Sequence, residues 1–125
     1  MRGVIPILRI GRVLLASIQL ELHDAAASAF QEDVLTALAR FESRGLVVDI
    51  TGLDMVDSHV ARVLVDTARM ARLMGADSVL VGMSPVIAAT LVRMGFPMEG
   101  VTTALNIEEG LKLFGVNVGA PEDER

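Results

Sequence analysis

The stretch LVVDITGLDMVDS, residues 46–58, contains the pattern that is most informative about the fold. Its first five residues form a nearly continuous apolar run, which is the pattern of a strand covered on both faces. Residues 51–57 predict a loop. Over 58–74 apolar residues recur at helical spacing, and Gly75 is placed to end that helix. A buried strand that leads through a loop into a helix is the repeating unit of a parallel α/β sheet.

The same alternation continues towards the C-terminus. Residues 78–81 predict another buried strand. Ser84 followed by Pro85 predicts the start of a helix over 86–94, which Gly95 ends. The pattern is completed by a short edge strand at 101–103 and by a last helix that starts at Asn106, with Glu109 three residues later, and ends near Phe114.

The N-terminal part predicts a hairpin and a helix. Apolar runs at 5–10 and 13–19 flank the pair Gly11-Arg12, and a two-residue link with Gly first suits a type II′ turn between antiparallel strands. Asp24 fits the N-cap of the next helix, and Gly45 fits the position just after its end. The apolar positions at helical spacing between them are Phe30, Val34, Leu38 and Phe41.

These elements predict one α/β domain over residues 1–118. Because helices alternate with strands after the hairpin, we expect a mixed, mostly parallel sheet with an N-terminal antiparallel hairpin, packed by about four helices. The sequence contains no internal repeat, linker or second domain. The polar residues 119–125 predict a disordered tail.

The composition bounds the compartment and the partners. The chain has 125 residues, of which 52% are hydrophobic, and a mean hydropathy of +0.53. Its longest uncharged stretch, 78–92, is too short for the roughly 20 apolar residues that a membrane span needs, and Arg9 and Arg12 interrupt any signal peptide. We therefore expect a cytoplasmic protein with no membrane association. The apolar surplus then indicates a partner interface and an oligomer.

Several chemistries are disfavoured by the residues themselves. A net charge of −5 argues against nucleic acid, and the absence of cysteine excludes disulfides, cysteine-ligated zinc and thiol catalysis. No phosphate-binding glycine motif is present. His23 and His59 lack a third metal ligand at recognisable spacing, and the contiguous Asp57-Ser58-His59 cannot form a catalytic triad. We expect no enzymatic activity, no cofactor and no metal.

The acidic stretch from Asp49 to Ser58 leaves two readings open. One is a Mg²⁺-dependent phospho-acceptor aspartate among Asp49, Asp54 and Asp57, as in the receiver domains of response regulators. Receiver domains, however, also need an acidic pair just after the first strand and a Lys after the last strand, and this sequence has neither. The other makes Ser58 the acceptor. Ser58 also fits the helix N-cap, so Ser58→Ala is expected to cost about 1 kcal/mol. A phosphate would add about 1.5–2 negative charges where the helix dipole tolerates them.

The same stretch resembles a known family. Asp54-Met55-Val56-Asp57-Ser58, after a buried strand and before an amphipathic helix, is similar to the phosphorylation loop of STAS domains, the anti-sigma-factor-antagonist family. Antagonists typically continue with a second small hydroxylated residue and Gly, where this chain has His59-Val60-Ala61. Four further segments resemble the small stressosome scaffold proteins of that family: 5–8, 17–19, 30–33 and 73–76.

The resemblance implies a fold, a set of partners and a role for each site residue. Such proteins co-assemble with larger STAS paralogues into a scaffold that holds a serine/threonine switch kinase. The kinase phosphorylates the serine matching Ser58 and is released, and a phosphatase resets the system. From their proximity we expect Asp54 and Asp57 to shape the loop and the kinase contact, and His59 and Arg62 to rim the docking surface.

Two alternatives stay open beside the scaffold. The chain could be a stand-alone anti-sigma-factor antagonist that binds one regulatory kinase as a simple heterodimer. The acidic loop could instead bind a nucleotide, although the sequence has no phosphate cradle for it.

Overall fold

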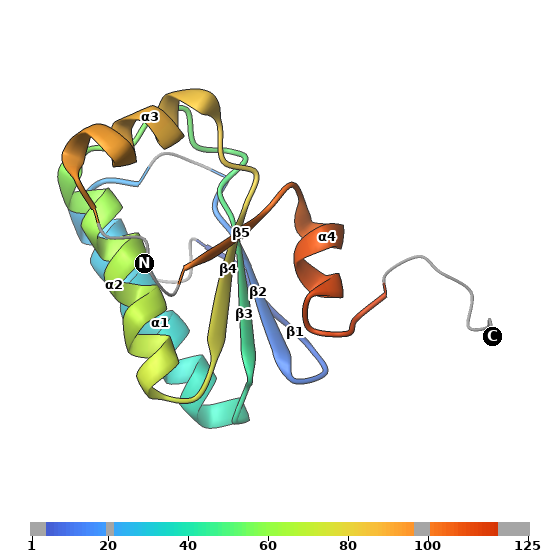
Figure 1. Ribbon diagram of the computed structural model, residues 1–125. Coiled ribbons are helices and arrows are strands. Elements are labelled where there is room, and N and C mark those ends of the chain that lie inside the picture. The colour runs from blue at the N-terminus through green and yellow to red at the C-terminus, as the bar shows by residue number, and fades with distance from the viewer. Residues whose placement is uncertain (1–4, 20–21, 97–100, 118–125) are drawn as a thin grey trace.

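The structure of the chain, a computed structural model, describes residues 5–19, 22–96 and 101–117 (Figure 1). In these residues the strands form one sheet whose spatial order follows the chain. The strands are β1 (Ile7–Ile10), β2 (Val13–Ser17), β3 (Gly45–Asp49), β4 (Asp77–Val81) and β5 (Thr102–Ala104). The helices are α1 (Asp24–Phe41), α2 (Ser58–Leu73), α3 (Pro85–Met94) and α4 (Ile107–Lys112). The predicted order of elements is confirmed.

The sheet is mixed, as predicted. β1 and β2 pair antiparallel, with Ile10 opposite Val13 and Gly11-Arg12 between them. Gly11 has φ +60°, which suits the first central position of a type II′ turn. The pairs β2–β3, β3–β4 and β4–β5 are parallel. The carboxyl ends of β2 to β5 therefore meet at one edge of the sheet, which we call the carboxyl edge.

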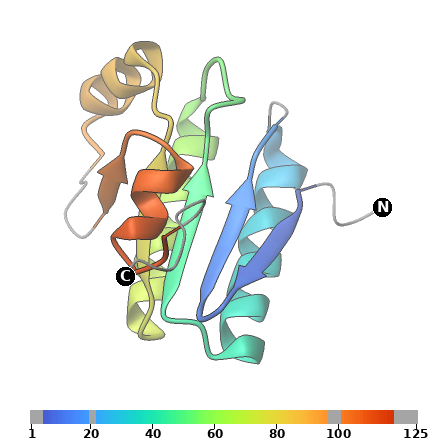
Figure 2. The same cartoon turned by 90° about the vertical axis from the view of Figure 1, so that its right-hand side faces the viewer.

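Helices cover both faces of the sheet. In Figure 1 the sheet is seen nearly edge-on, with α1, α2 and α3 on one side and α4 on the other. Figure 2 looks onto the second face, where α4 lies over the half of the sheet formed by β3, β4 and β5. In β3, Leu46 and Val48 belong to the core under α1 and α2, whereas Val47 belongs to the core under α4. The apolar run at 46–50 is thus a strand buried on both faces.

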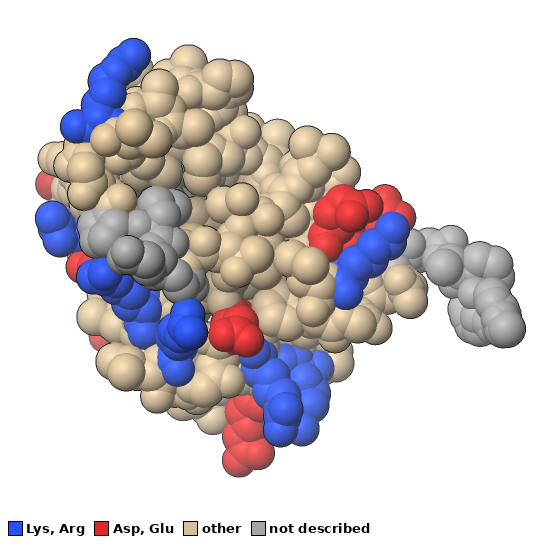
Figure 3. Space-filling view, viewed as in Figure 1, with Lys and Arg blue, Asp and Glu red and all other residues tan. Residues whose placement is uncertain are grey.

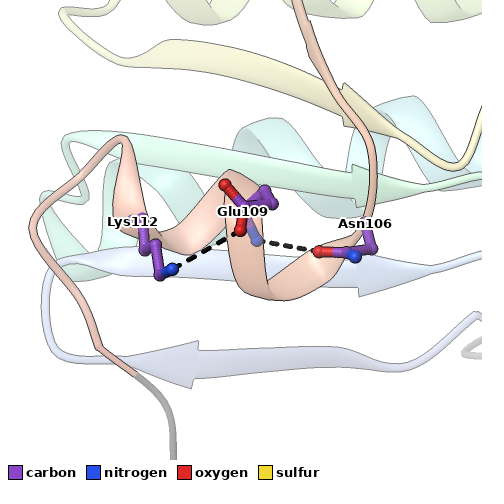
Figure 4. A network of polar contacts seen from close by, with 3 residues as sticks. All are labelled: Asn106, Glu109 and Lys112. Carbon is purple, nitrogen blue, oxygen red and sulfur yellow. Dashed lines mark hydrogen bonds and ion pairs between the residues drawn. The ribbon is translucent and has the colours of Figure 1, made fainter. Parts of the chain in front are cut away.

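Two helix starts follow the predicted caps. The Ser84 hydroxyl accepts a hydrogen bond from the Ile87 N–H at 3.1 Å, with Pro85 as the first residue of α3. The Asn106 side chain accepts from the Glu109 N–H at 2.9 Å (Figure 4). The Glu109 carboxylate points towards Lys112, whose Nζ lies 3.4 Å away. Local sequence decides both starts, because each cap is a bond between residues three apart.

The bounds of α1 correct two predictions. His23 occupies the N-cap position without a side-chain hydrogen bond, and Asp24 is the first helical residue. The helix ends at Phe41, and Glu42 takes the left-handed conformation with φ +50°. Gly45 is the first residue of β3, and a Cβ there would lie 2.7 Å from the Phe114 ring. Gly45 is therefore needed for close packing and not for ending the helix.

Other bounds shift slightly. β1 begins at Ile7 rather than residue 5, β5 runs to Ala104, and α4 ends at Lys112 before Phe114. The predicted tail at 119–125 lies outside the described residues. In the described part of the chain, no helix has the length and apolar character needed to cross a membrane.

Candidate functional site

The candidate site is the segment that joins β3 to α2, residues 50–57, together with the first turn of α2. It leaves the sheet at the carboxyl edge, and α3 lies at the same edge in both views (Figures 1 and 2). Parallel α/β sheets place their sites at this edge, since the loops that follow each strand gather there.

Asp49 braces the base of this loop. The residue is only 7% exposed, and its Oδ1 accepts hydrogen bonds from the Thr51 N–H at 2.9 Å and from the Thr51 hydroxyl at 2.6 Å. Oδ2 accepts from the Ser17 hydroxyl of the neighbouring strand at 3.4 Å. A buried carboxylate needs such donors, because burial without them is costly. Asp49 therefore fixes the direction in which the chain leaves β3.

Two close approaches hold the loop against both neighbouring strands. A Cβ on Gly52 would lie 2.7 Å from the Ile18 carbonyl oxygen. A Cβ on Gly82, which has φ +80°, would lie 1.9 Å from the Thr51 hydroxyl oxygen. The loop is thus packed between the segments that follow β2 and β4, and Thr51 is in contact with both Asp49 and Gly82.

The rest of the loop alternates between buried and exposed side chains. Leu53 and Val56 are buried in the core under the helices. Asp54 and Met55 lie between them, and both are exposed, Met55 to 63%. The two apolar anchors hold the loop down, so that the side chains between them and after them face outward.

The start of α2 corrects the predicted cap. Asp57 is the N-cap, and its Oδ1 accepts a hydrogen bond from the Val60 N–H at 2.8 Å. Ser58 is the first helical residue and is exposed, and its hydroxyl makes no hydrogen bond to the residues that the structure describes. The prediction that Ser58 caps the helix is wrong. Asp57 takes that position directly after the buried Val56.

The other two predicted residues lie on the same turns of α2. His59 and Arg62 are both exposed. The guanidinium carbon of Arg62 lies 5.2 Å from the centroid of the Phe96 ring, just after α3. All five predicted site residues thus lie at one end of α2. Asp49 is not among them, because its carboxylate faces inward, and no group of three acidic or histidine residues in the described ranges could hold a metal ion.

Sequence reasoning missed Thr51, Gly82 and Phe96. The spacing Asp49-x-Thr51 is a signal for a local side-chain turn and could have been noticed. Gly82 and Phe96 had no such signal, because they are 31 and 34 residues along the chain from Thr51 and Arg62. Gly82 meets Thr51 through the pairing of β3 with β4, and Phe96 meets Arg62 because it follows α3.

The chain is similar to several curated proteins. A profile of the STAS domain matches residues 5–110. The RsbT co-antagonist protein RsbRA of Bacillus subtilis is 31% identical over 86 residues, which are 69% of this chain and 31% of the relative. The co-antagonist RsbRC of the same bacterium is 32% identical over 97 residues, 74% of this chain and 34% of the relative. The chain spans about a third of the length of these relatives.

Solved structures match over most of the chain. The S58E variant of RsbS from Moorella thermoacetica is 37% identical with a TM-score of 0.81, covering 90% of this chain and 95% of that one. A chain from a solved stressosome is 39% identical with a TM-score of 0.77, covering 88% and 96%. The unphosphorylated anti-sigma factor antagonist SpoIIAA, 16% identical, shares the fold with a TM-score of 0.69 over 90% of this chain and all of that one.

Proposed function

The chain belongs to the STAS domain family, and we propose that it is a phosphorylation-controlled scaffold of the RsbS type. In this proposal it co-assembles with larger STAS paralogues, holds a serine/threonine switch kinase, and releases that kinase when Ser58 is phosphorylated. The similarity to RsbS and to a stressosome chain supports the assembly. The relatives named RsbT co-antagonists, roughly three times as long as the matched segment, support the larger paralogue and a kinase of the RsbT type as partners.

One observation carries the proposal. Ser58 is exposed at the first position of α2, and its hydroxyl has no hydrogen-bond partner among the described residues because Asp57 takes the cap. Ser84, at the start of α3, is the contrast, since its hydroxyl is bonded to the Ile87 N–H. Of the two serines at the starts of α2 and α3, Ser58 is therefore the one whose hydroxyl is available to accept a phosphate. Ser58 is then a substrate of another protein's chemistry, and we propose no catalytic role, cofactor or metal for this chain.

The surroundings of Ser58 suit a charge switch. Asp54 and Asp57 are exposed on either side of Met55 and Val56, so a phosphate would add about 1.5–2 negative charges to a surface that already carries two. The amino end of α2 tolerates that charge within the fold. A partner docked on the surface would be repelled, while the fold itself would not need to rearrange.

An uncharged surface at the same edge suits the docking of the partner. In Figure 3 the surface over α3 is uncharged except for basic atoms at its upper left edge, and further basic side chains lie lower, beside and below α2. Val86, Val92 and Met94 of α3 are exposed large apolar side chains. We propose that the kinase contacts this surface together with Asp54 and Asp57 of the loop and His59 and Arg62 of α2, all four of which are exposed. A kinase that uses Mg-ATP works in the cytoplasm, where we place the assembly.

Mapping of phosphosites tests the acceptor. The full chain is incubated with its cognate kinase and Mg-ATP, and the phosphorylated residues are identified by mass spectrometry. We expect phosphate on Ser58 and none on Ser84, and no incorporation into Ser58→Ala. The Ser28→Ala variant, which removes an exposed serine of α1, is the control and should be phosphorylated normally. Absence of phosphate from Ser58 in the unmodified chain would refute the acceptor role.

The size of the assembly separates the scaffold from its alternative. The chain is mixed with a larger STAS paralogue and measured by light scattering. A large, defined complex supports the scaffold, whereas a small heterodimer with a kinase and no paralogue complex would favour a stand-alone anti-sigma-factor antagonist. A calorimetric titration with GTP and ATP tests nucleotide binding by the acidic loop, for which we expect no heat of binding.

A further inference from the structure

We infer that Arg62 is the residue that binds the phosphate on Ser58, and that it leaves the Phe96 ring to do so. The inference deepens the proposed function, because it states what phosphorylation does to the docking surface. It rests on three observations: the spacing of Ser58 and Arg62 on α2, the present contact of Arg62, and the absence of an ion pair between Arg62 and any described carboxylate.

The spacing brings the two side chains onto one face of α2. Ser58 and Arg62 are four residues apart, one helical turn, and both are exposed. Side chains in a helix lean towards its amino end, so the long Arg62 side chain leans towards Ser58. A phosphate on the Ser58 oxygen would extend into the space that this side chain can reach. The phosphate on Ser58 and the Arg62 guanidinium would thus both belong to α2, and they could pair without a change of fold.

Arg62 is held at present only by a weak contact. Its guanidinium lies over the Phe96 ring at 5.2 Å from the centroid. No carboxylate of the described residues forms an ion pair with it. Asp66 lies one helical turn further along α2 and is not paired with it, and Asp57 accepts from the Val60 N–H. A cation over a ring at an exposed site is held less strongly than one paired with a doubly charged phosphate.

The chemistry of arginine favours the phosphate. The planar guanidinium presents a fork of N–H donors that matches two phosphate oxygens at once, which a ring cannot offer. Moving Arg62 to the phosphate also uncovers Phe96 and removes a positive charge from the docking surface. Phosphorylation would therefore change the surface twice: it adds negative charge at Ser58, and it draws away an exposed cation one helical turn from it that could pair with a partner's carboxylate.

A thermodynamic cycle on the full chain tests the pairing. Phosphoserine is placed at position 58 during synthesis, so the test does not depend on any kinase. Thermal midpoints are measured for the phosphorylated and unphosphorylated forms of the unmodified chain and of Arg62→Gln. We expect phosphorylation to lower the midpoint of Arg62→Gln by about 3 °C more than that of the unmodified chain at low salt, and the difference to shrink at high salt.

The matched control is Arg69→Gln. Arg69 is also exposed on α2, but eleven residues from Ser58, roughly 16 Å along the helix axis. This variant loses the same charge from the same helix and should show no coupling to the phosphate. The charged groups near Ser58, namely Asp54, Asp57 and His59, are the same in every arm and cancel in the comparison. Coupling that is equal for Arg62 and Arg69 would overturn the inference.

A spectroscopic readout distinguishes pairing from a general charge effect. The Nε–H resonance of Arg62 should shift on phosphorylation, and the Phe96 ring resonances should shift with it as the guanidinium leaves. Phe96→Leu should strengthen the coupling, because Arg62 then has no ring to leave. Unchanged Arg62 and Phe96 signals would refute the inference, even where Ser58 proves to be the kinase's acceptor. Conversely, failure of the kinase to phosphorylate Ser58 would refute the proposed function and leave this cycle intact.

Discussion

Asp57 and Ser58 are neighbours that divide two tasks at the start of α2. Both residue types cap helices well, but the side chain that caps α2 is the Asp57 carboxylate. The exposed hydroxyl of Ser58 is left without a structural role in the described contacts. At the scale of single residues, stability and signalling should therefore be separable by mutation.

Asp57→Ala should lower the free energy of unfolding by about 1 kcal/mol, because the Val60 N–H loses its acceptor. Asp57→Asn is the matched control, since Asn caps as well as Asp while lacking the charge. Urea denaturation followed by circular dichroism measures both. Equal destabilisation by Ala and Asn would mean that the charge of Asp57, and not its cap, stabilises α2.

Ser58→Ala should change the free energy of unfolding by less than about 0.5 kcal/mol, because the hydroxyl has no bond to lose. This replaces the value of about 1 kcal/mol expected from a capping serine. The same variant should hold the kinase and fail to release it in the presence of Mg-ATP, measured by pull-down of the kinase.

Ser58→Asp should weaken kinase binding, because it adds negative charge beside Asp54 and Asp57. Ser28→Asp adds the same charge at an exposed position of α1 and should bind the kinase normally. Titration calorimetry gives both dissociation constants. If Ser58→Asp bound as tightly as the unmodified chain, repulsion would be the wrong mechanism.

At the scale of elements, the loop before α2 is held by the strands on either side of β3. Thr51 lies between the buried Asp49 carboxylate and the backbone of Gly82. The position of Ser58 therefore depends on the end of β4, although no residue of β4 touches Ser58 in any described contact. The connection is Thr51, which lies against Gly82 and is bonded to Asp49 in the loop that leads to Ser58.

Gly82→Ala should destabilise the fold by at least about 2 kcal/mol, because it adds a Cβ at φ +80° and 1.9 Å from the Thr51 hydroxyl oxygen. Gly75→Ala is the matched control: Gly75 has φ +91°, but its Cβ would meet no atom within 4 Å. That variant should lose only the conformational part, about 1 kcal/mol. Equal losses in urea denaturation would show that Thr51 simply moves aside.

At the scale of the whole molecule, the chain leaves large apolar side chains exposed at opposite ends. Val92 of α3 is 80% exposed at the carboxyl edge, and Leu73 is 90% exposed at the end of α2. Val86 and Met94 are exposed beside Val92, as are Met70 and Met74 beside Leu73. Two separated apolar surfaces are what the proposed scaffold role requires, because the chain would then bind neighbours in the assembly and a kinase at the same time.

Val92→Glu should weaken kinase binding at least tenfold, whereas Leu73→Glu should leave it unchanged, because Val92 belongs to α3 at the carboxyl edge while Leu73 ends α2, fifteen residues after Ser58. Both substitutions are at exposed positions, so each should change the free energy of unfolding by less than about 0.5 kcal/mol. Surface plasmon resonance with the immobilised kinase measures the binding. Normal binding by Val92→Glu would remove α3 from the docking surface.

The sequence by itself determined the order of elements and several of their ends. Burial of 46–50 on both faces, the type II′ turn at Gly11-Arg12, and the caps at Ser84 and Asn106 were all predictable. Each depends on apolar periodicity or on bonds between residues at most three apart, so the local residues contain all the information needed. The position of Asp54, Asp57 and Ser58 near the carboxyl end of a strand was predictable too, because they follow the buried apolar run at 46–50.

Only the tertiary structure decided which of two neighbours caps α2 and what holds the loop. Leu53 and Val56 are buried before α2 begins, Asp57 caps the helix, and Ser58 has no hydrogen-bond partner among the described residues. Gly45 lets the chain pack against the Phe114 ring, 69 residues away, and the Arg62 guanidinium lies over the ring of Phe96, which follows α3. These choices depend on contacts between distant residues, which no local pattern encodes.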